Sequence, residues 1–128
     1  IEARVLGDLT MNHIIPMATK YQSSLIDNVY KMRELFPADK AAHLSSKNME
    51  IIEDIANRTI FIKEKVDEMV NARKIANKIE NEREKAIAYH DQIVPMMEAI
   101  RYHIDKLELV VDDQIWTLPK YRELLFIR

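Results

Sequence analysis

Residues 52–76, which read IEDIANRTIFIKEKVDEMVNARKIA, decide the fold of this chain. The side chains of one helical face recur in this stretch at spacings that alternate strictly between three and four residues. These residues are Ile52, Ile55, Thr59, Ile62, Val66, Met69, Arg73 and Ala76. Lysine and glutamate residues lie between them, as on a solvated helix face. The pattern predicts an amphipathic helix over about residues 45–77, with Ser45 or Ser46 as its N-cap.

The stretch before this helix carries a similar periodicity and predicts a first helix over about residues 1–36. Its apolar seam comprises Val5, Leu9, Ile14, Ala18, Tyr21, Leu25, Val29, Met32 and Phe36. Pro16 interrupts the seam, and we expect a kink there because its ring lacks an N–H and clashes with the carbonyl four residues earlier. Pro37 ends the helix, since the residue before a proline is disfavoured in the helical region. Residues 37–44 are expected to form a loop.

A third helix is predicted over about residues 82–112. Its seam comprises Ile93, Met97, Ile100, Ile104, Leu107 and Val111. Pro95 should bend this helix for the same reason as the proline of the first helix. A break near residues 77–81 is indicated by Asn81 with Glu84 three residues later, which resembles a capping box. One continuous helix through this point is the alternative.

Composition agrees with a helical protein. The chain has 128 residues, 48% of them hydrophobic and 31% charged, which suits one folded domain with a solvated surface. One glycine and four prolines leave few positions for the turns that a sheet requires. Helices of about 30 residues would be about 45 Å long. We therefore predict an all-α fold in a single domain, residues 1–128: an elongated antiparallel bundle of three long helices with proline kinks, plus a short C-terminal tail helix.

The tail, residues 113–128, is unusually apolar for a chain end. Its large apolar side chains are Trp116, Leu118, Tyr121, Leu124, Leu125, Phe126 and Ile127. They must pack either on this bundle or on something outside the chain, and Pro119 can start a short last helix. Asp112 and Asp113 oppose the dipole of the preceding helix. Three roles are open for them: they accept from backbone N–H groups, pair with cations of the tail, or bind a divalent metal with Glu108.

Few residues suggest catalysis. The four histidines, His13, His43, His90 and His103, lack the glutamate three residues earlier that di-iron bundles use. His13 and His103 neighbour core seams and could form hydrogen bonds near the proline kinks. The chain has no cysteine and one glycine, which argues against a thiolate site and a phosphate-binding loop. With a net charge of −2 and dispersed basic residues, nucleic-acid binding has little support. We assign no catalytic, cofactor-binding or metal residue.

An interaction surface is a stronger expectation. The helix over residues 45–77 carries apolar residues outside its main seam: Ile51, Ile60, Phe61, Val70 and Ile79. A large exposed apolar patch normally marks an interface. The candidate interface residues are Phe61, Val70, Trp116, Tyr121 and Phe126. We expect self-association, most simply as a symmetric homodimer, which charging both Phe61 and Val70 would abolish.

Two segments resemble a known family. They are IEARVLGDLTMNHIIPMATKYQ, residues 1–22, and RYHIDKLELVVDDQIWTLPKYRELLF, residues 101–126. Together they are similar to the C-terminal helical domain of type III glutamine synthetases. The similarity spans the chain at low resolution, whereas residues 38–92 alone would not identify a family. The chain starts at Ile1 rather than at a methionine, which suggests a fragment.

The resemblance implies a parent enzyme that joins glutamate and ammonia with ATP and a divalent metal such as Mg²⁺, and that assembles as a large oligomer of stacked rings. It implies that the ligands for these groups belong to an upstream catalytic domain, so this chain alone would have no ligase activity. The implied partners are that domain and neighbouring subunits. From the composition, the net charge and the lack of a long apolar run we expect a cytoplasmic protein with no nucleic-acid or membrane partner. The alternatives are an independent helical interaction module and, less favoured, a bundle enzyme or metal carrier.

Overall fold

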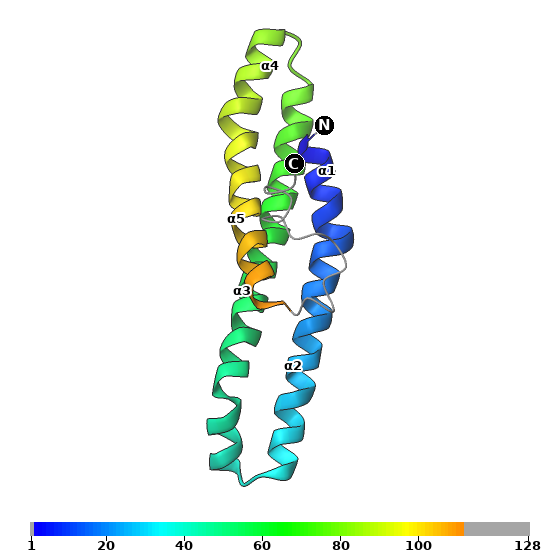
Figure 1. The fold of residues 1–128 in the computed structure, drawn as a ribbon. Helices are drawn as coiled ribbons and strands as arrows, with labels where there is room; N and C mark the ends of the chain where they lie inside the picture. Colours follow the sequence, from blue (N-terminus) through cyan, green and yellow to red (C-terminus); the bar gives the residue numbers. More distant parts are fainter. Residues whose placement is uncertain (1, 112–128) are drawn as a thin grey trace, which may run out of the picture.

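The computed structural model describes residues 2–111, and these residues form helices with no strand among them. The helical segments are α1 (Glu2–Leu9), η1 (Thr10–Ile14), α2 (Ile15–Leu35), α3 (Ala38–Asn77), α4 (Glu82–Ala88), η2 (Tyr89–Ile93) and α5 (Val94–Val110). They make three packed helices, because η1 joins α1 to α2 and η2 joins α4 to α5 (Figure 1). The all-α prediction and the three-helix packing are confirmed.

The helices run as an elongated, up-down-up arrangement. The first helix, α1–η1–α2, lies beside α3 along almost its whole length, and the third, α4–η2–α5, covers the part of α3 nearer its C-terminal end (Figure 1). The third helix ends well short of the α2–α3 turn, so the far part of α2 and α3 projects as a two-helix hairpin (Figure 1). None of the helices in the described part is both long and apolar enough to cross a membrane.

The connection between α2 and α3 is much shorter than predicted. The expected loop over residues 37–44 is wrong, because α3 begins at Ala38 and only Phe36 and Pro37 separate the helices. Phe36 is extended (φ −124°, ψ 156°), as expected for a residue before proline. Pro37 then occupies the N-cap position of α3. Asp39 lies in the first turn, where its negative charge interacts favourably with the helix dipole. The sequence pattern missed this start because the first two turns of α3 are rich in alanine and polar residues.

Neither serine that was expected to cap this helix does so. Ser45 is buried inside α3, and the Ser46 hydroxyl donates to the carbonyl of His43 at 2.9 Å.

The predicted boundary between the second and third helices is correct. α3 ends at Asn77, and the side-chain oxygen of Asn81 accepts a hydrogen bond from the backbone N–H of Glu84 at 3.0 Å. The second and third helices are therefore separate, and the alternative of one continuous helix is wrong.

A π-helical turn precedes both helical prolines. In η1 the backbone N–H of Ile15 donates to the carbonyl of Thr10, five residues earlier, and in η2 that of Val94 donates to Tyr89. Each π segment ends two residues before its proline, at Ile14 and Ile93. The wider turn gives one more residue in which to accommodate the proline ring and the missing N–H. The bends expected at these prolines stay a prediction.

The core contains most of the predicted seams. All six residues predicted for the third helix are buried, and the α3 seam is buried at Ile55, Ile62, Val66, Met69 and Ala76. The beginning of the first seam is wrong, because Val5 is 59% exposed and Leu9 37%. Ala3, Leu6, Gly7 and Thr10 are buried instead. Leu6 is the one large apolar residue of these four, so a pattern read from large apolar residues alone could not identify this face.

The predicted tail, residues 113–128, and its short helix lie outside the described residues. The same holds for Asp112 and Asp113, whose three alternative roles stay predictions.

Candidate interaction surfaces

The two interface candidates on α3 lie on different sides of the helix. Phe61 and Val70 are nine residues apart, which is two and a half turns, so their side chains point in opposite directions. The Phe61 ring contacts the imidazole of His103 on α5, with ring centroids 4.2 Å apart. Val70 lines a groove that faces α1. The two residues therefore cannot form a single surface; Trp116, Tyr121 and Phe126 lie outside the described residues.

The remaining apolar residues outside the α3 seam divide in a similar way. Ile51 is partly buried and packs against the core, and Ile79 is also partly buried. Ile60 is 55% exposed. Around the helix, Ile60 lies about 80° from Val70 and about 100° from Phe61, so it shares a face with neither residue.

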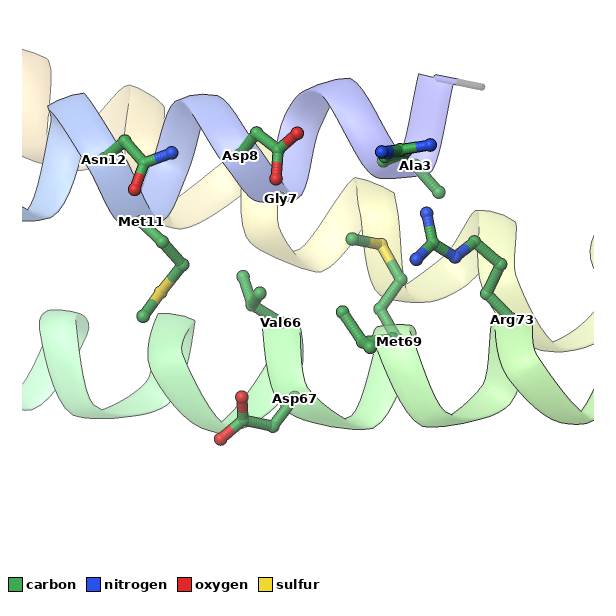
Figure 2. Close-up of a pocket in the computed structure, with 11 residues that line it drawn as sticks. Ala3, Gly7, Asp8, Met11, Asn12, Val66, Asp67, Met69 and Arg73 are labelled. Carbon is green, nitrogen blue, oxygen red and sulfur yellow. The ribbon is translucent and has the colours of Figure 1, made fainter.

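A groove runs between α1 and α3 (Figure 2). It has a volume of about 210 Å³. Gly7 lies at its floor, where an added Cβ would meet Met69 Cε at 3.7 Å and Val66 Cγ1 at 3.8 Å. Those are ordinary van der Waals distances, so the helices approach closely here without requiring a glycine. The floor of the groove is therefore apolar.

Charged side chains line the two ends of this groove. α1 runs antiparallel to α3, which places Arg4 near Arg73 and Asp8 near Asp67. Figure 2 shows Arg73 lying toward Ala3 between the two helices, whereas the Asp67 side chain projects from the side of α3 away from α1. No ion pair within the described residues involves any of these four charged side chains. The groove thus has Arg4 and Arg73 at one end and Asp8 toward the other.

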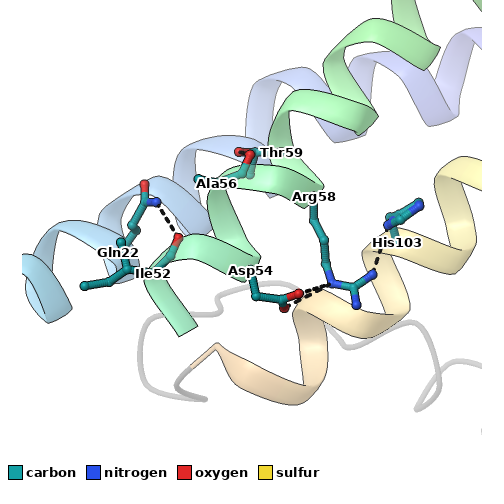
Figure 3. A network of polar contacts seen from close by, with 7 residues as sticks. All are labelled: Gln22, Ile52, Asp54, Ala56, Arg58, Thr59 and His103. Carbon is teal, nitrogen blue, oxygen red and sulfur yellow. Dashed lines mark hydrogen bonds and ion pairs between the residues drawn. The ribbon is translucent and has the colours of Figure 1, made fainter. Parts of the chain in front are cut away.

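A polar bridge joins α3 to α5 on the opposite side (Figure 3). The Arg58 Nε lies 3.1 Å from both carboxylate oxygens of Asp54, one helical turn earlier. Its Nη1 lies 3.0 Å from Nδ1 of His103. Because a guanidinium can only donate, Nδ1 must accept, which places the proton of the neutral imidazole on Nε2. The bridge therefore holds His103 in one neutral tautomer.

The surroundings of His103 disfavour its charged form. Burial lowers the pKa of His103 below its ordinary value of 6.5, and the nearby Arg58 lowers it further, while Asp54 acts in the opposite direction. His103 was expected to lie beside a core seam, but the sequence pattern did not identify Arg58 as its partner. The available signal was the Asp54–Arg58 spacing of four residues, which commonly forms a helical ion pair.

The α2–α3 hairpin carries a second groove. It has a volume of about 260 Å³ and is lined by Ile26, Val29, Tyr30, Arg33, Met49 and Ile52. Hydrogen bonds tie the two helices together, from Gln22 Nε2 to the carbonyl of Ile52 at 3.0 Å and from Asn48 Nδ2 to Asn28 Oδ1 at 2.9 Å. The hairpin is therefore a defined structural element that exposes apolar side chains.

Metal chemistry has no candidate in the described part of the chain. No group of three His, Cys, Asp or Glu side chains there could hold an ion. Glu108, which was considered as a ligand together with Asp112 and Asp113, is only 1% exposed and lies in the core region of α5. The other two acids lie outside residues 2–111, so that hypothesis stays untested.

Comparisons with known proteins agree with the resemblance found in the sequence. Residues 1–33 match the family described as glutamine synthetase C-terminal domain. The whole chain is 49% identical over 128 residues to a glutamine synthetase of Bacteroides fragilis (strain YCH46), of which it covers 18%. It is 28% identical over 132 aligned positions to a type-3 glutamine synthetase of Dictyostelium discoideum, of which it covers 17%.

The chain thus spans less than a fifth of the length of these relatives, although each similarity covers all of it. The described helices accordingly correspond to one region of these longer relatives. Over its full length, the chain is homologous to the C-terminal region of glutamine synthetases, including one of type 3.

Proposed function

We propose that this chain is the C-terminal accessory domain of a type III glutamine synthetase, with a structural role in the assembly of the enzyme. The observation that carries the proposal is the full-length similarity to a glutamine synthetase at 49% identity. The parent protein would ligate ammonia to glutamate with ATP, in glutamine biosynthesis and nitrogen metabolism. Because the chain covers 18% of that relative, most of such an enzyme lies outside it.

In this proposal the chain alone performs no catalysis. ATP and Mg²⁺ would be bound by the catalytic domain of the parent, so we assign no cofactor ligand to any of the 128 residues. The experiment is an assay of glutamine formation from glutamate, ammonia and MgATP, with the isolated chain and the full-length parent side by side. We expect product only from the parent. Turnover by the isolated chain that scales with its concentration and survives repurification would overturn the proposal.

The partners in this proposal are the upstream catalytic domain and neighbouring subunits of a cytoplasmic oligomer. Two features of the described residues support a docking role. The α1–α3 groove has charges without ion-pair partners in the described residues, and the α2–α3 hairpin exposes an apolar groove. Rigid helices that present such surfaces suit contacts with other domains better than binding of a small molecule in an enclosed site.

The second candidate function is an independent helical interaction or dimerisation module. Ile60 of α3, which is 55% exposed, favours it, because exposed apolar side chains on a helix can pack against another helix. The coding sequence immediately upstream of Ile1 discriminates between the two functions. An adjoining glutamine synthetase catalytic domain supports the accessory role, whereas an unrelated upstream sequence supports the independent module.

The finer features of the fold are also proposals. We propose that residues 1–128 form one domain, that the helices bend at Pro16 and Pro95, and that the tail forms a short helix. The π-helical turns before both prolines support the bends, because such turns commonly accompany a change in helix direction. Replacing either proline by alanine should straighten the local axis, which an experimental structure of the variant would show.

A further inference from the structure

The α2–α3 hairpin extends past the end of the third helix. The contact between Arg58 and His103 sets the level at which α5 lies beside α3, and α5 ends at Val110, two helical turns beyond His103. Because α5 runs antiparallel to α3, its end lies near the level of Ile51, two turns before Arg58. Residues 38–50 of α3, about 20 Å of helix, therefore have no third helix beside them (Figure 1).

The side of α3 that α5 covers stays apolar beyond this end. Residues seven apart lie on nearly the same side of a helix, so Leu44 and Ile51 share the side of Arg58. Ile51 is partly buried and packs against the core, whereas Leu44 is 43% exposed. The exposure of this side therefore rises where α5 has ended.

α2 shows the same change along its length. Tyr21 and Leu25 are partly buried and pack against the core. Leu35 lies four turns beyond Tyr21 on the same side, and it is 75% exposed. Met32 lies two turns beyond Leu25. The side of α2 that packs on the core thus also continues as an apolar surface into the hairpin.

The hydrogen bond from Asn48 Nδ2 to Asn28 Oδ1, 2.9 Å long, indicates how these two surfaces are aligned. One turn nearer the α2–α3 connection on each helix, Met32 lies opposite Leu44. Together with Leu35 these residues form an apolar surface of the hairpin, which we call the open face. It continues the side of the bundle on which α5 packs.

We infer that the open face binds residues 112–128 of the same chain. The chain leaves α5 at the edge of this face, because Val111 follows the helix in an extended conformation (φ −79°, ψ 135°). At about 3.3 Å per residue, the residues from 112 to 118 are long enough to cross the roughly 20 Å of open hairpin. Large apolar side chains recur from Trp116 to Ile127, and an apolar face would remove them from water.

Direct attachment favours this occupant over a separate molecule. A segment joined to the end of α5 is present at a high effective concentration beside the open face, so it binds without the loss of freedom that two separate molecules incur. The inference goes beyond the proposed accessory role, because it concerns packing within one chain and holds whether or not the parent is a ligase.

The fluorescence of Trp116 tests the inference, since it is the only tryptophan of the chain. We expect blue-shifted emission that does not change with protein concentration. Leu44→Glu should shift the emission to the red, toward that of the urea-unfolded chain, because a carboxylate on the open face is costly to bury. Met49→Glu is the matched control. Met49 is 48% exposed and lies about 140° from Leu44 around α3, so this variant should keep the original emission.

Three results would overturn the inference. Emission of the unaltered chain at the wavelength of the unfolded chain would show that the open face does not bind this segment. A red shift in Met49→Glu as large as that in Leu44→Glu would show that the segment does not select this face. Emission that becomes blue-shifted only as the concentration rises would identify a second copy as the occupant. The accessory role would stand in each case, because the activity and assembly of the parent test it.

A label provides a second readout that adds no charge to the open face. The chain contains no cysteine, so L44C introduces a single thiol to which a nitroxide can be attached. A nitroxide quenches tryptophan fluorescence at close contact. The label on L44C should cause a clear loss of Trp116 emission, and the same label on M49C a much smaller one. Urea should abolish the difference, whereas equal quenching by the two labels in the folded chain would contradict the inference.

Discussion

Ile62 and Ile60 provide a sharp test of the packing of α3, because they are the same residue type two positions apart on one helix. Ile62 is 0% exposed within the core, whereas Ile60 is 55% exposed. Replacing a fully buried isoleucine by alanine removes its transfer free energy and leaves a cavity, which together lower the free energy of unfolding by about 2–5 kcal/mol. The same change at Ile60 removes little buried area, and alanine is the better helix former by a few tenths of a kcal/mol.

Urea unfolding followed by far-ultraviolet circular dichroism measures both variants under identical conditions. We expect Ile62→Ala to lower the free energy of unfolding by about 3 kcal/mol. That corresponds to a fall of roughly 10 °C in Tm for a chain of this size. Ile60→Ala should stay within about 0.5 kcal/mol of the original. Equal losses at the two positions, or a larger loss at Ile60, would show that α3 is rotated from the orientation described here and would refute the core assignment.

Three further outcomes are expected. The pKa of His103 is lowered below 6.5 in the folded chain, so as the pH falls the unfolded chain protonates this imidazole first. The free energy of unfolding should therefore decline as the pH falls below about 6.5. Melting curves recorded across this pH range should show that His103→Gln removes that part of the decline. Gly7→Ala should raise the free energy of unfolding by about 0.5–1 kcal/mol, since its Cβ meets only ordinary contacts; a loss in urea titration would contradict this. Asn81→Ala should lower it by about 1 kcal/mol through the lost bond to the Glu84 N–H, and unchanged stability would show that this cap contributes nothing.

The sequence predicted the parts of the fold that depend on large apolar residues at helical spacing. The seams of α3 and α5 could be identified because burying large apolar side chains such as Ile55, Ile62 and Ile100 is strongly favourable and these residues recur at helical spacing. The Asn81 cap could be identified as well, since capping depends on a local spacing.

Other features could not be identified because they depend on contacts between helices. The buried residues of α1 are Ala3, Leu6 and Gly7, and only the approach of the neighbouring helix distinguishes this face from the one that carries the apolar Val5. The start of α3 was predicted seven residues late, since its first turns lack large apolar residues. Phe61 and Val70 were grouped by composition, although their angular separation on one helix could have distinguished them.

The contacts at the candidate surfaces also depend on how the helices pack together. The bond between Arg58 and His103 joins residues 45 positions apart, and no local spacing indicates it. The proximity of Arg4 to Arg73 likewise emerges only when α1 is placed antiparallel to α3.

The central claim is that this chain is an accessory domain that supports assembly of a larger ligase. The most direct measurement is the native mass of the full-length parent compared with a version that ends immediately before Ile1, at matched concentration. The account predicts that the full-length protein forms a large oligomer and that the shortened one dissociates into smaller species while its remaining domain stays folded. An oligomer of unchanged subunit number in the shortened protein would contradict it.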